Sequence, residues 1–169
     1  MPSARFEVSQ KRAALSENGC DEVVFLLSVN PGENMRELSK VASGGELSRI
    51  MLAIKTVLSG SEDTGTFIFD EIDTGISGIA AQKVGRKLRE ISKNVQVLCV
   101  THLPQIAALA DHHFLTEKNM SDEKTYTSVR ELSFEGRVHE LAHMIGGDEI
   151  TDTMLKNASE MISHSDRAK

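Results

Sequence analysis

Two adjacent carboxylates, Asp70 and Glu71, follow directly after the short apolar run Thr66-Phe67-Ile68-Phe69. Such a run predicts a buried strand, and in open α/β sheets ligands bind beyond the carboxyl ends of strands. At that position Asp70 is suited to hold Mg²⁺, directly or through water. Glu71 is suited to orient and deprotonate an attacking water molecule. A strand followed by a simple acidic turn is the alternative, and the pair alone leaves it open.

A histidine, His102, stands at the end of the next apolar run, Val95–Val100. A histidine at a strand end can contact a γ-phosphate and sense its loss. The alternative is a satisfied histidine at the start of the following helix. Together with the two carboxylates, His102 favours a site for nucleotide triphosphate hydrolysis.

A third feature is the glycine pair in Ser43-Gly44-Gly45-Glu46, which opens a predicted helix. Backbone N–H groups and the positive end of a helix attract anions, and glycine lets a phosphate approach the backbone closely. Ser43 and Glu46 also fit a plain capping box, with Ser43 as the N-cap. Both interpretations can hold together.

The loop that normally cradles the phosphates is missing. A hydrolase of this class needs G-x-x-x-x-G-K-[ST]. Gly60 and Gly65 have the right separation, but Thr66 and Phe67 follow them, and the chain contains no Gly-Lys dipeptide. The phosphate cradle must therefore come from elsewhere.

The spacing of apolar residues predicts the elements that position these groups. We expect strands at 4–14, 22–29, 66–69, 95–100, 114–118 and 126–132, and helices at 44–58, 76–93, 103–110, 136–145 and 152–162. In the helix over 76–93, Ile79, Val84, Leu88 and Ile91 are expected to point inward. Strands alternating with helices indicate an α/β domain with a parallel-rich sheet flanked by helices. We expect residues 1–169 to form a single domain.

The bulk composition is that of a globular protein with an aliphatic core. Hydrophobic residues make up 40% of the 169 residues, aromatic residues 4%, and Trp is absent. The sequence shows neither a signal peptide pattern nor an apolar run long enough to cross a membrane, so a cytoplasmic location is expected. The net charge of −6 argues against DNA binding over the whole surface. Cys20 and Cys99 lack metal-ligand spacing, and Cys99 is expected to be a buried free thiol.

Three stretches closely resemble the RecN family of bacterial DNA repair proteins. They are Ser43-Gly44-Gly45-Glu46-Leu47-Ser48-Arg49, Phe69-Asp70-Glu71-Ile72-Asp73-Thr74-Gly75-Ile76-Ser77-Gly78 and Val100-Thr101-His102-Leu103-Pro104-Gln105. Related chromosome-organising ATPases share the shorter motifs but not the run from Asp73 to Gly78. The resemblance extends over nearly the whole chain.

This resemblance implies the C-terminal half of an ABC-type (SMC-like) P-loop ATPase head, whose Walker A half lies in an N-terminal part of the same protein beyond a coiled coil. Ser43, Gly44, Gly45 and Glu46 would belong to the signature that contacts ATP on a second head. Asp70 would be the Walker B ligand of Mg²⁺, Glu71 the general base, Asp73 part of the D-loop and His102 the switch histidine.

The implied cofactors are ATP and Mg²⁺. The implied partners are the N-terminal Walker A half, a second copy of the head in an ATP-dependent homodimer, DNA and recombination proteins. The expected role is recombinational repair of double-strand breaks in the bacterial cytoplasm, at the nucleoid. Without Walker A, the fragment alone is expected to be inactive.

Two alternatives belong to other functional classes. His139-Glu140-Leu141-Ala142-His143 fits H-E-x-x-H, which places two histidines on one helix face as zinc requires and suggests a metallopeptidase. An amphipathic helix with incidental histidines explains the same pattern. The second alternative is a non-catalytic module that pairs heads or docks a partner. Lys83, Arg86 and Lys87 could then touch DNA, although a solvated helix face is the simpler explanation.

Overall fold

The computed structural model describes residues 4–28, 32–40, 43–58, 65–121 and 124–167 of the chain. Residues 29–31 and 59–64 lie outside the described residues. They include the end of the second expected strand with its turn, and most of the polar linker before the third expected strand. The strands are β1 (Arg5–Ser16), β2 (Gly19–Ser28), β3 (Arg36–Glu37), β4 (Thr66–Phe69), β5 (Gln96–Cys99), β6 (Phe114–Ser121) and β7 (Lys124–Glu131). The helices are η1 (Leu38–Lys40), α1 (Gly44–Leu58), α2 (Gly78–Ser92), α3 (Pro104–Ala107), α4 (Phe134–Gly146) and α5 (Asp152–Arg167).

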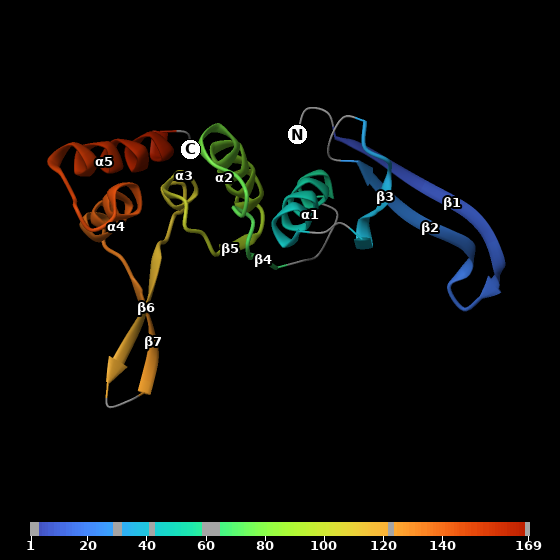
Figure 1. Cartoon of the computed structure of the whole chain (residues 1–169), viewed down its shortest axis with the longest axis horizontal. Helices are drawn as coiled ribbons and strands as arrows, with labels where there is room; N and C mark the ends of the chain where they lie inside the picture. Colours follow the sequence, from blue (N-terminus) through green and yellow to red (C-terminus); the bar gives the residue numbers. More distant parts are fainter. Residues whose placement is uncertain (1–3, 29–31, 41–42, 59–64, 122–123, 168–169) are drawn as a thin grey trace.

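The expected α/β class is confirmed, with both parallel and antiparallel sheets in the described part of the chain. β4 and β5 form a parallel pair, β1, β2 and β3 an antiparallel sheet, and β6 and β7 an antiparallel hairpin. Figure 1 shows the parallel pair at the centre, with the β1–β2 hairpin and the α4–α5 pair at opposite ends. The predicted site residues Asp70, Glu71 and His102 therefore follow the two strands of the parallel pair.

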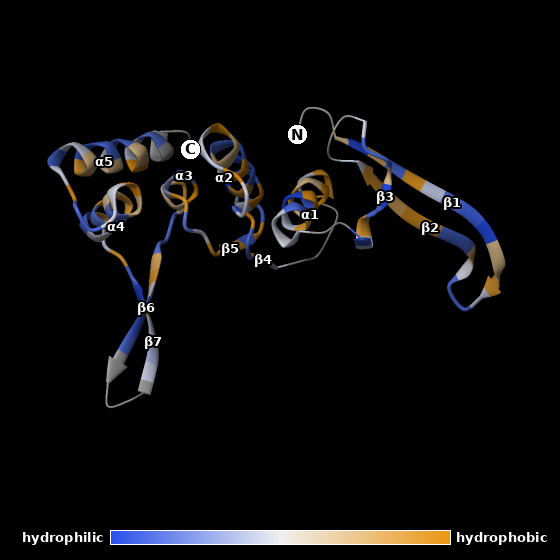
Figure 2. Ribbon diagram, in the orientation of Figure 1, coloured by the Kyte–Doolittle hydropathy of each residue, from blue (hydrophilic) through white to orange (hydrophobic). Residues whose placement is uncertain are grey.

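The β1–β2 hairpin is long and open on one side. Phe6 pairs with Leu27 and Val8 with Phe25, so these residues share one face of the ladder. Phe6 and Phe25 stack with ring centroids 5.7 Å apart, yet Phe6, Val8 and Phe25 all remain exposed. Orange bands along β1 and β2 in Figure 2 mark apolar residues of this hairpin.

The β4–β5 pair has one covered face and one open face. Because side chains alternate across a strand, Phe67 and Phe69 face a core that also contains Leu88 and Ile91 of α2. On the other face, Ile68 is 71% exposed and Val100, just past β5, is 63% exposed. Parallel strands are normally covered on both faces, so this pair lacks one covering layer within the described residues.

A second buried cluster joins α4 and α5 to the rest of the molecule through α3. Leu141 of α4 and Ile162 of α5 are fully buried against Ala107 at the end of α3. Two arginines fix the segment that follows α3: Arg89 of α2 donates to Leu109 O at 2.8 Å, and Arg137 of α4 donates to Ala110 O at 2.6 Å. The region after β5 is therefore held from both sides.

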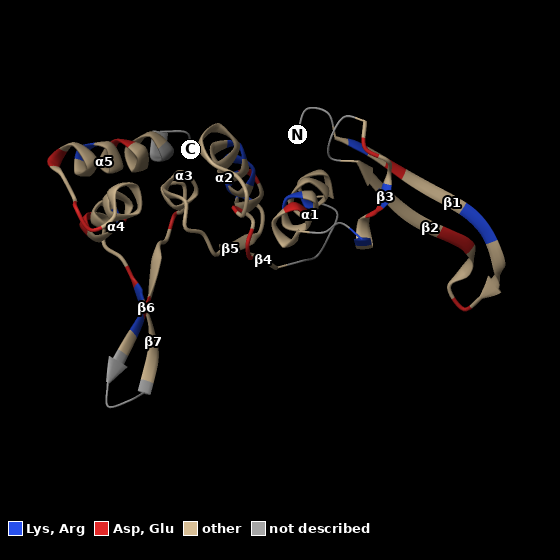
Figure 3. Ribbon diagram, in the orientation of Figure 1, with Lys and Arg blue, Asp and Glu red and all other residues tan. Residues whose placement is uncertain are grey.

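Acidic and basic side chains are unevenly distributed. In Figure 3, Lys and Arg gather along α2, whereas acidic residues follow the end of β4. Among the described helices, none is long and apolar enough to cross a membrane.

Candidate functional site

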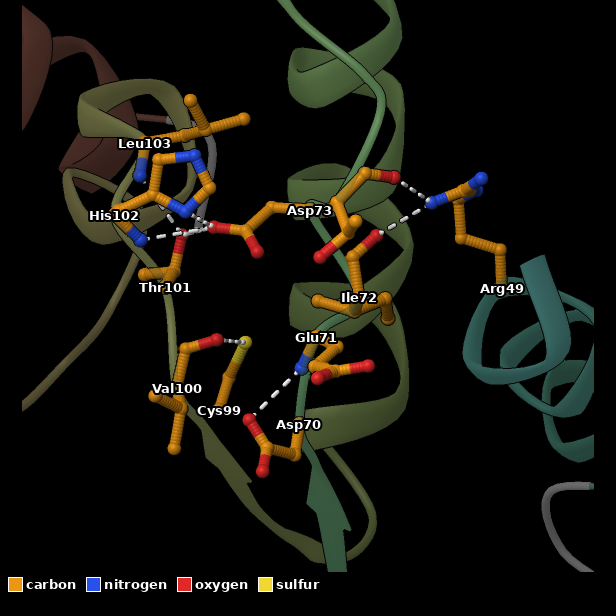
Figure 4. A network of polar contacts seen from close by, with 11 residues as sticks. Arg49, Asp70, Glu71, Ile72, Asp73, Cys99, Val100, Thr101, His102 and Leu103 are labelled. Carbon is orange, nitrogen blue, oxygen red and sulfur yellow. Dashed lines mark hydrogen bonds and ion pairs between the residues drawn. The ribbon is translucent and has the colours of Figure 1, made fainter. Parts of the chain in front are cut away.

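The two strands that carry the predicted site residues end side by side. Phe69 pairs with Cys99 at the last rung of the parallel ladder, and Val100 N donates to Phe69 O at 3.0 Å. The loop from Asp70 to Thr74 consequently runs beside the segment from Val100 to Leu103, as Figure 4 shows. The residues that follow the two strands therefore lie at the same edge of the parallel pair.

Asp73 points into the protein and contacts the segment after β5. Only 3% of Asp73 is exposed. Its Oδ2 accepts hydrogen bonds from Thr101 Oγ1 at 2.6 Å and from His102 N at 2.8 Å. His102 Nδ1 lies 3.1 Å from the same oxygen. Asp73 thus ties the two loops together.

The charge on Asp73 is stabilised by these contacts. Burial alone would raise the pKa of the carboxyl group, but the hydrogen bonds from Thr101 and His102 and the charge of His102 outweigh burial and lower the pKa below its ordinary value. Asp73 is therefore a carboxylate at neutral pH, and its anchoring role persists there.

His102 is fixed on one side and open on the other. Its Nδ1 faces Asp73, while 73% of the side chain is exposed. Since one ring nitrogen is oriented by a carboxylate, the rest of the ring is presented outward in a defined direction.

Asp70 and Glu71 are both exposed at the end of β4. Asp70 Oδ1 accepts a hydrogen bond from Glu71 N at 2.9 Å. The φ of Glu71 is 56°, a left-handed conformation that non-glycine residues adopt rarely and often at functional sites. Asp70 can offer a carboxylate to Mg²⁺, which often takes one or two carboxylates together with phosphates and waters. The described residues contain no group of three or more His, Cys, Asp or Glu side chains that could hold a metal by themselves.

The start of α1 packs against this loop within the same chain. Ser43 Oγ accepts a hydrogen bond from Glu46 N at 3.2 Å, so Ser43 caps the helix as expected. A Cβ on Gly44 would collide with the Glu71 carboxylate, and one on Gly45 would lie 2.9 Å from Glu71 O. Gly45 is therefore required for packing against the backbone of the loop, whereas the exposed Glu71 side chain can move away from a Cβ on Gly44.

Two residues to which the sequence assigned no role also hold the loop after β4. Ser48 Oγ donates to Asp70 O at 2.9 Å. Arg49 Nη1 donates to Ile72 O at 3.1 Å and to Thr74 O at 2.8 Å. Their partners are backbone carbonyls more than twenty residues away in the chain. Backbone carbonyls have no sequence signature, so the sequence could not predict these bonds.

Cys99 lies at the end of β5 and is partly buried. Burial raises the pKa of its thiol to about 12, and the negative charges of Asp73 and Asp70 add to this effect. The thiol is consequently protonated and inert at neutral pH.

The H-E-x-x-H segment lies on α4, away from the strand ends. His143 Nδ1 is 3.7 Å from Glu140 Oε1, and His143 Nε2 is 3.5 Å from Asp148 Oδ1. Neither His139 nor His143 belongs to a metal-holding group among the described residues. Leu141 and Ala142 between them are buried, in agreement with an amphipathic helix that carries incidental histidines.

Comparison with known proteins gives a consistent result. No protein-family model matches the chain. DNA repair protein RecN of Bacillus subtilis is 48% identical over 162 residues, which is 96% of this chain and 28% of that protein. RecN of Vibrio cholerae is 46% identical over 164 residues, again 96% of this chain and 30% of that protein. The chain therefore spans less than a third of the length of these relatives.

Solved structures show the same fold. A Smc head domain with a coiled coil and joint, derived from Pyrococcus yayanosii, superposes with a TM-score of 0.60 at 21% identity, over 83% of this chain and 26% of that one. A structure from work on ATP-driven dimerisation and DNA-stimulated activation of SMC ATPases gives a TM-score of 0.50 at 20% identity over 84% of each chain. The fold is that of part of a P-loop ATPase head. Over nearly its whole length the chain is RecN-like, and it corresponds to the C-terminal part of that DNA repair protein.

Proposed function

We propose that residues 1–169 form a single domain, the C-terminal half of an ATPase head that hydrolyses ATP during recombinational repair of DNA double-strand breaks. One observation carries the proposal. Three predicted groups of site residues lie close together, although the sequence has no G-x-x-x-x-G-K-[ST] loop to cradle phosphates. The carboxylates after β4 begin the loop from Asp70 to Thr74, and both His102 after β5 and the glycine pair of α1 contact this loop. This arrangement supplies the hydrolytic side of a nucleotide site and leaves the phosphate cradle to another part of the protein.

Each residue has a role that its position supports. Asp70 would hold Mg²⁺, which neutralises phosphate charge when it is bound. Glu71 is exposed one residue further and would take the proton of the attacking water. His102 would face the γ-phosphate with its outward ring atoms.

The start of α1 would contact the phosphates of an ATP molecule held by a second copy of the head. Ser43, Gly44, Gly45 and Glu46 open a 15-residue helix, whose first N–H groups and positive end favour anions. In this structure Gly44 and Gly45 lie against Glu71 of their own chain. Asp73, predicted as part of the D-loop, is buried, and we propose that it acts by positioning the loops rather than by touching ATP.

The missing layer over β4–β5 indicates where the other half of the head would bind. Ile68, Leu98 and Val100 leave an apolar surface on the open face, with Leu98 46% exposed. At about 25 cal/mol per Å² of apolar area removed from water, covering three such side chains contributes several kcal/mol. An N-terminal segment that carries Walker A fits this surface, and until it binds the isolated fragment is expected to be inactive.

The remaining partners follow from the relatives. ATP-driven dimerisation and DNA-stimulated activation are described for SMC ATPases that share this fold, and the relatives of similar sequence are bacterial DNA repair proteins. We extend both to this protein: ATP-dependent pairing of heads, contact with DNA and with recombination proteins, and a cytoplasmic place at the nucleoid.

The test is the variant Glu71→Gln in the full-length protein. Loss of a general base should slow ATP hydrolysis about 10²-fold or more while ATP binding stays intact. Ser43→Arg should instead leave ATP binding intact and abolish ATP-dependent pairing in sedimentation. Near-normal turnover of Glu71→Gln removes Glu71 from its role, and unchanged pairing of Ser43→Arg refutes the shared site.

A further inference from the structure

We infer that Arg49 is a positioning residue that couples the start of α1 to His102 through the loop after β4. Its meaning for catalysis rests on the proposed function, in which these two ends contact different ATP molecules. The coupling itself rests on hydrogen bonds that are independent of any nucleotide.

Arg49 grips the loop on the side of α1. One nitrogen, Nη1, donates to both Ile72 O and Thr74 O, at 3.1 Å and 2.8 Å. The preceding residue, Ser48, adds a hydroxyl that donates to Asp70 O at 2.9 Å. Because the guanidinium group is planar and presents several donors in a fixed geometry, one side chain can hold both carbonyls.

The guanidinium group is also confined. Arg49 Nε is buried and has no hydrogen-bond partner among the described residues. An unpaired buried donor is costly, so the pair of bonds made by Nη1 must outweigh that cost for the side chain to stay in place. A Cβ on Gly45 would lie 3.0 Å from the same Nη1, so the glycine pair leaves the space that the guanidinium needs.

Asp73 lies between Ile72 and Thr74, the two residues whose carbonyls accept hydrogen bonds from Arg49. Its carboxylate is the anchor of Thr101 and His102 on the opposite side of the loop. Ile72 O belongs to the peptide group directly before Asp73, and Thr74 O to the peptide group that follows Thr74. Holding both restrains the backbone on either side of Asp73, and thereby the direction of its carboxylate and the ring of His102. Figure 4 shows this succession from Arg49 on one side to His102 on the other.

The consequence is a path between two nucleotide sites. Movement of α1 when a phosphate of the second head binds its first turn would displace the loop through Arg49, and the loop would re-aim His102 through Asp73. Misplacement of a catalytic group by about 1 Å can cost up to 10²-fold in rate, so a short chain of hydrogen bonds suffices to make hydrolysis depend on head pairing.

The test compares Arg49→Met, Arg49→Lys and Lys156→Met in the full-length protein. Arg49→Met keeps the apolar stem and removes the donors, whereas Arg49→Lys keeps one cationic donor group. Lys156→Met removes an exposed cation on α5, far from the loop, and serves as the matched control. We measure steady-state ATP hydrolysis and backbone hydrogen exchange.

In Arg49→Met we expect kcat to fall about 10-fold while KM for ATP stays within about 2-fold, the signature of a lost transition-state contribution. Exchange at the His102 amide, which Asp73 protects, should rise, whereas exchange in α4 and α5 should not. Arg49→Lys should recover part of kcat, and Lys156→Met should match the wild type.

Unchanged exchange at His102 in Arg49→Met overturns the coupling, even if kcat falls. A double-mutant cycle with Thr101→Val provides a second criterion. If Arg49 and Thr101 act through one loop, the two losses in kcat are less than additive, whereas full additivity refutes the path. The exchange result requires no ATP, so it separates failure of this coupling from failure of the proposed ATPase role, which Glu71→Gln tests.

Discussion

Replacement of Thr101 by valine should destabilise the chain through the Asp73 anchor. Thr101 Oγ1 donates to the Asp73 carboxylate at 2.6 Å and accepts from Leu103 N at 3.1 Å. A hydrogen bond to a charged group contributes about 1.5–3 kcal/mol. Leu103 is only half-buried, so water can replace the lost acceptor of its N–H at little cost. We therefore expect a loss of about 2–3 kcal/mol at neutral pH.

The assay is urea unfolding of the 169-residue chain, followed by far-UV circular dichroism, with Thr101→Ser as the control that keeps the hydroxyl. With a slope of about 2–3 kcal/mol per M, the midpoint of Thr101→Val should fall by about 1 M. Thr101→Ser should fall much less, because it loses only a methyl group.

The pH dependence of this loss has a definite sign. The pKa of Asp73 is lowered in the folded chain, so its stabilisation is present above the unfolded pKa of about 3.9 and is lost as the pH falls through the folded pKa. The difference between wild type and Thr101→Val should accordingly shrink on acidification below about pH 4. A difference in unfolding free energy under about 0.5 kcal/mol at neutral pH is the size of an ordinary surface substitution. Such a small difference, or a difference that persists in acid, refutes the stabilising role of the Thr101–Asp73 hydrogen bond.

Three further outcomes test other parts of the structure. Gly45→Ala should cost about 1–3 kcal/mol in unfolding free energy, because its Cβ would press on the loop after β4; Gly65→Ala, with nothing within 4 Å, is the control. Maleimide labelling near pH 8 should modify Cys20 at least about 10-fold faster than Cys99, whose pKa is raised to about 12; equal rates contradict that shift. Ile68→Lys should leave the unfolding midpoint of the chain nearly unchanged and abolish binding of a separately produced N-terminal half, and retained binding places that half elsewhere.

The elements around the site could be predicted because their signals are local. The helix over 44–58 and the strand over 66–69 have the predicted bounds, since a 3.6-residue period and a short apolar run identify them directly. Asp70 and His102 both follow parallel strands that end at one edge of the sheet, but the side chain that contacts the segment of His102 is that of Asp73.

The hydrogen-bonding of the loop could not be predicted in this way. Arg49 binds backbone carbonyls, which have no sequence signature, and Thr101 was visible only as the neighbour of a histidine. Ile79 was expected to point inward but is 73% exposed. Hydrophobic spacing identifies a helix face, but it does not show that the covering surface stops short of the first turn of α2.

The open face of β4–β5 affects how this chain behaves in solution on its own. Each of the two strands has one hydrogen-bonded neighbour among the described residues, so apolar side chains and unpaired strand edges are exposed together. Such a surface recruits other strands and favours aggregation. The isolated chain should therefore self-associate as its concentration rises, and a partner that covers this face should act as a solubility factor as well as a source of the phosphate loop.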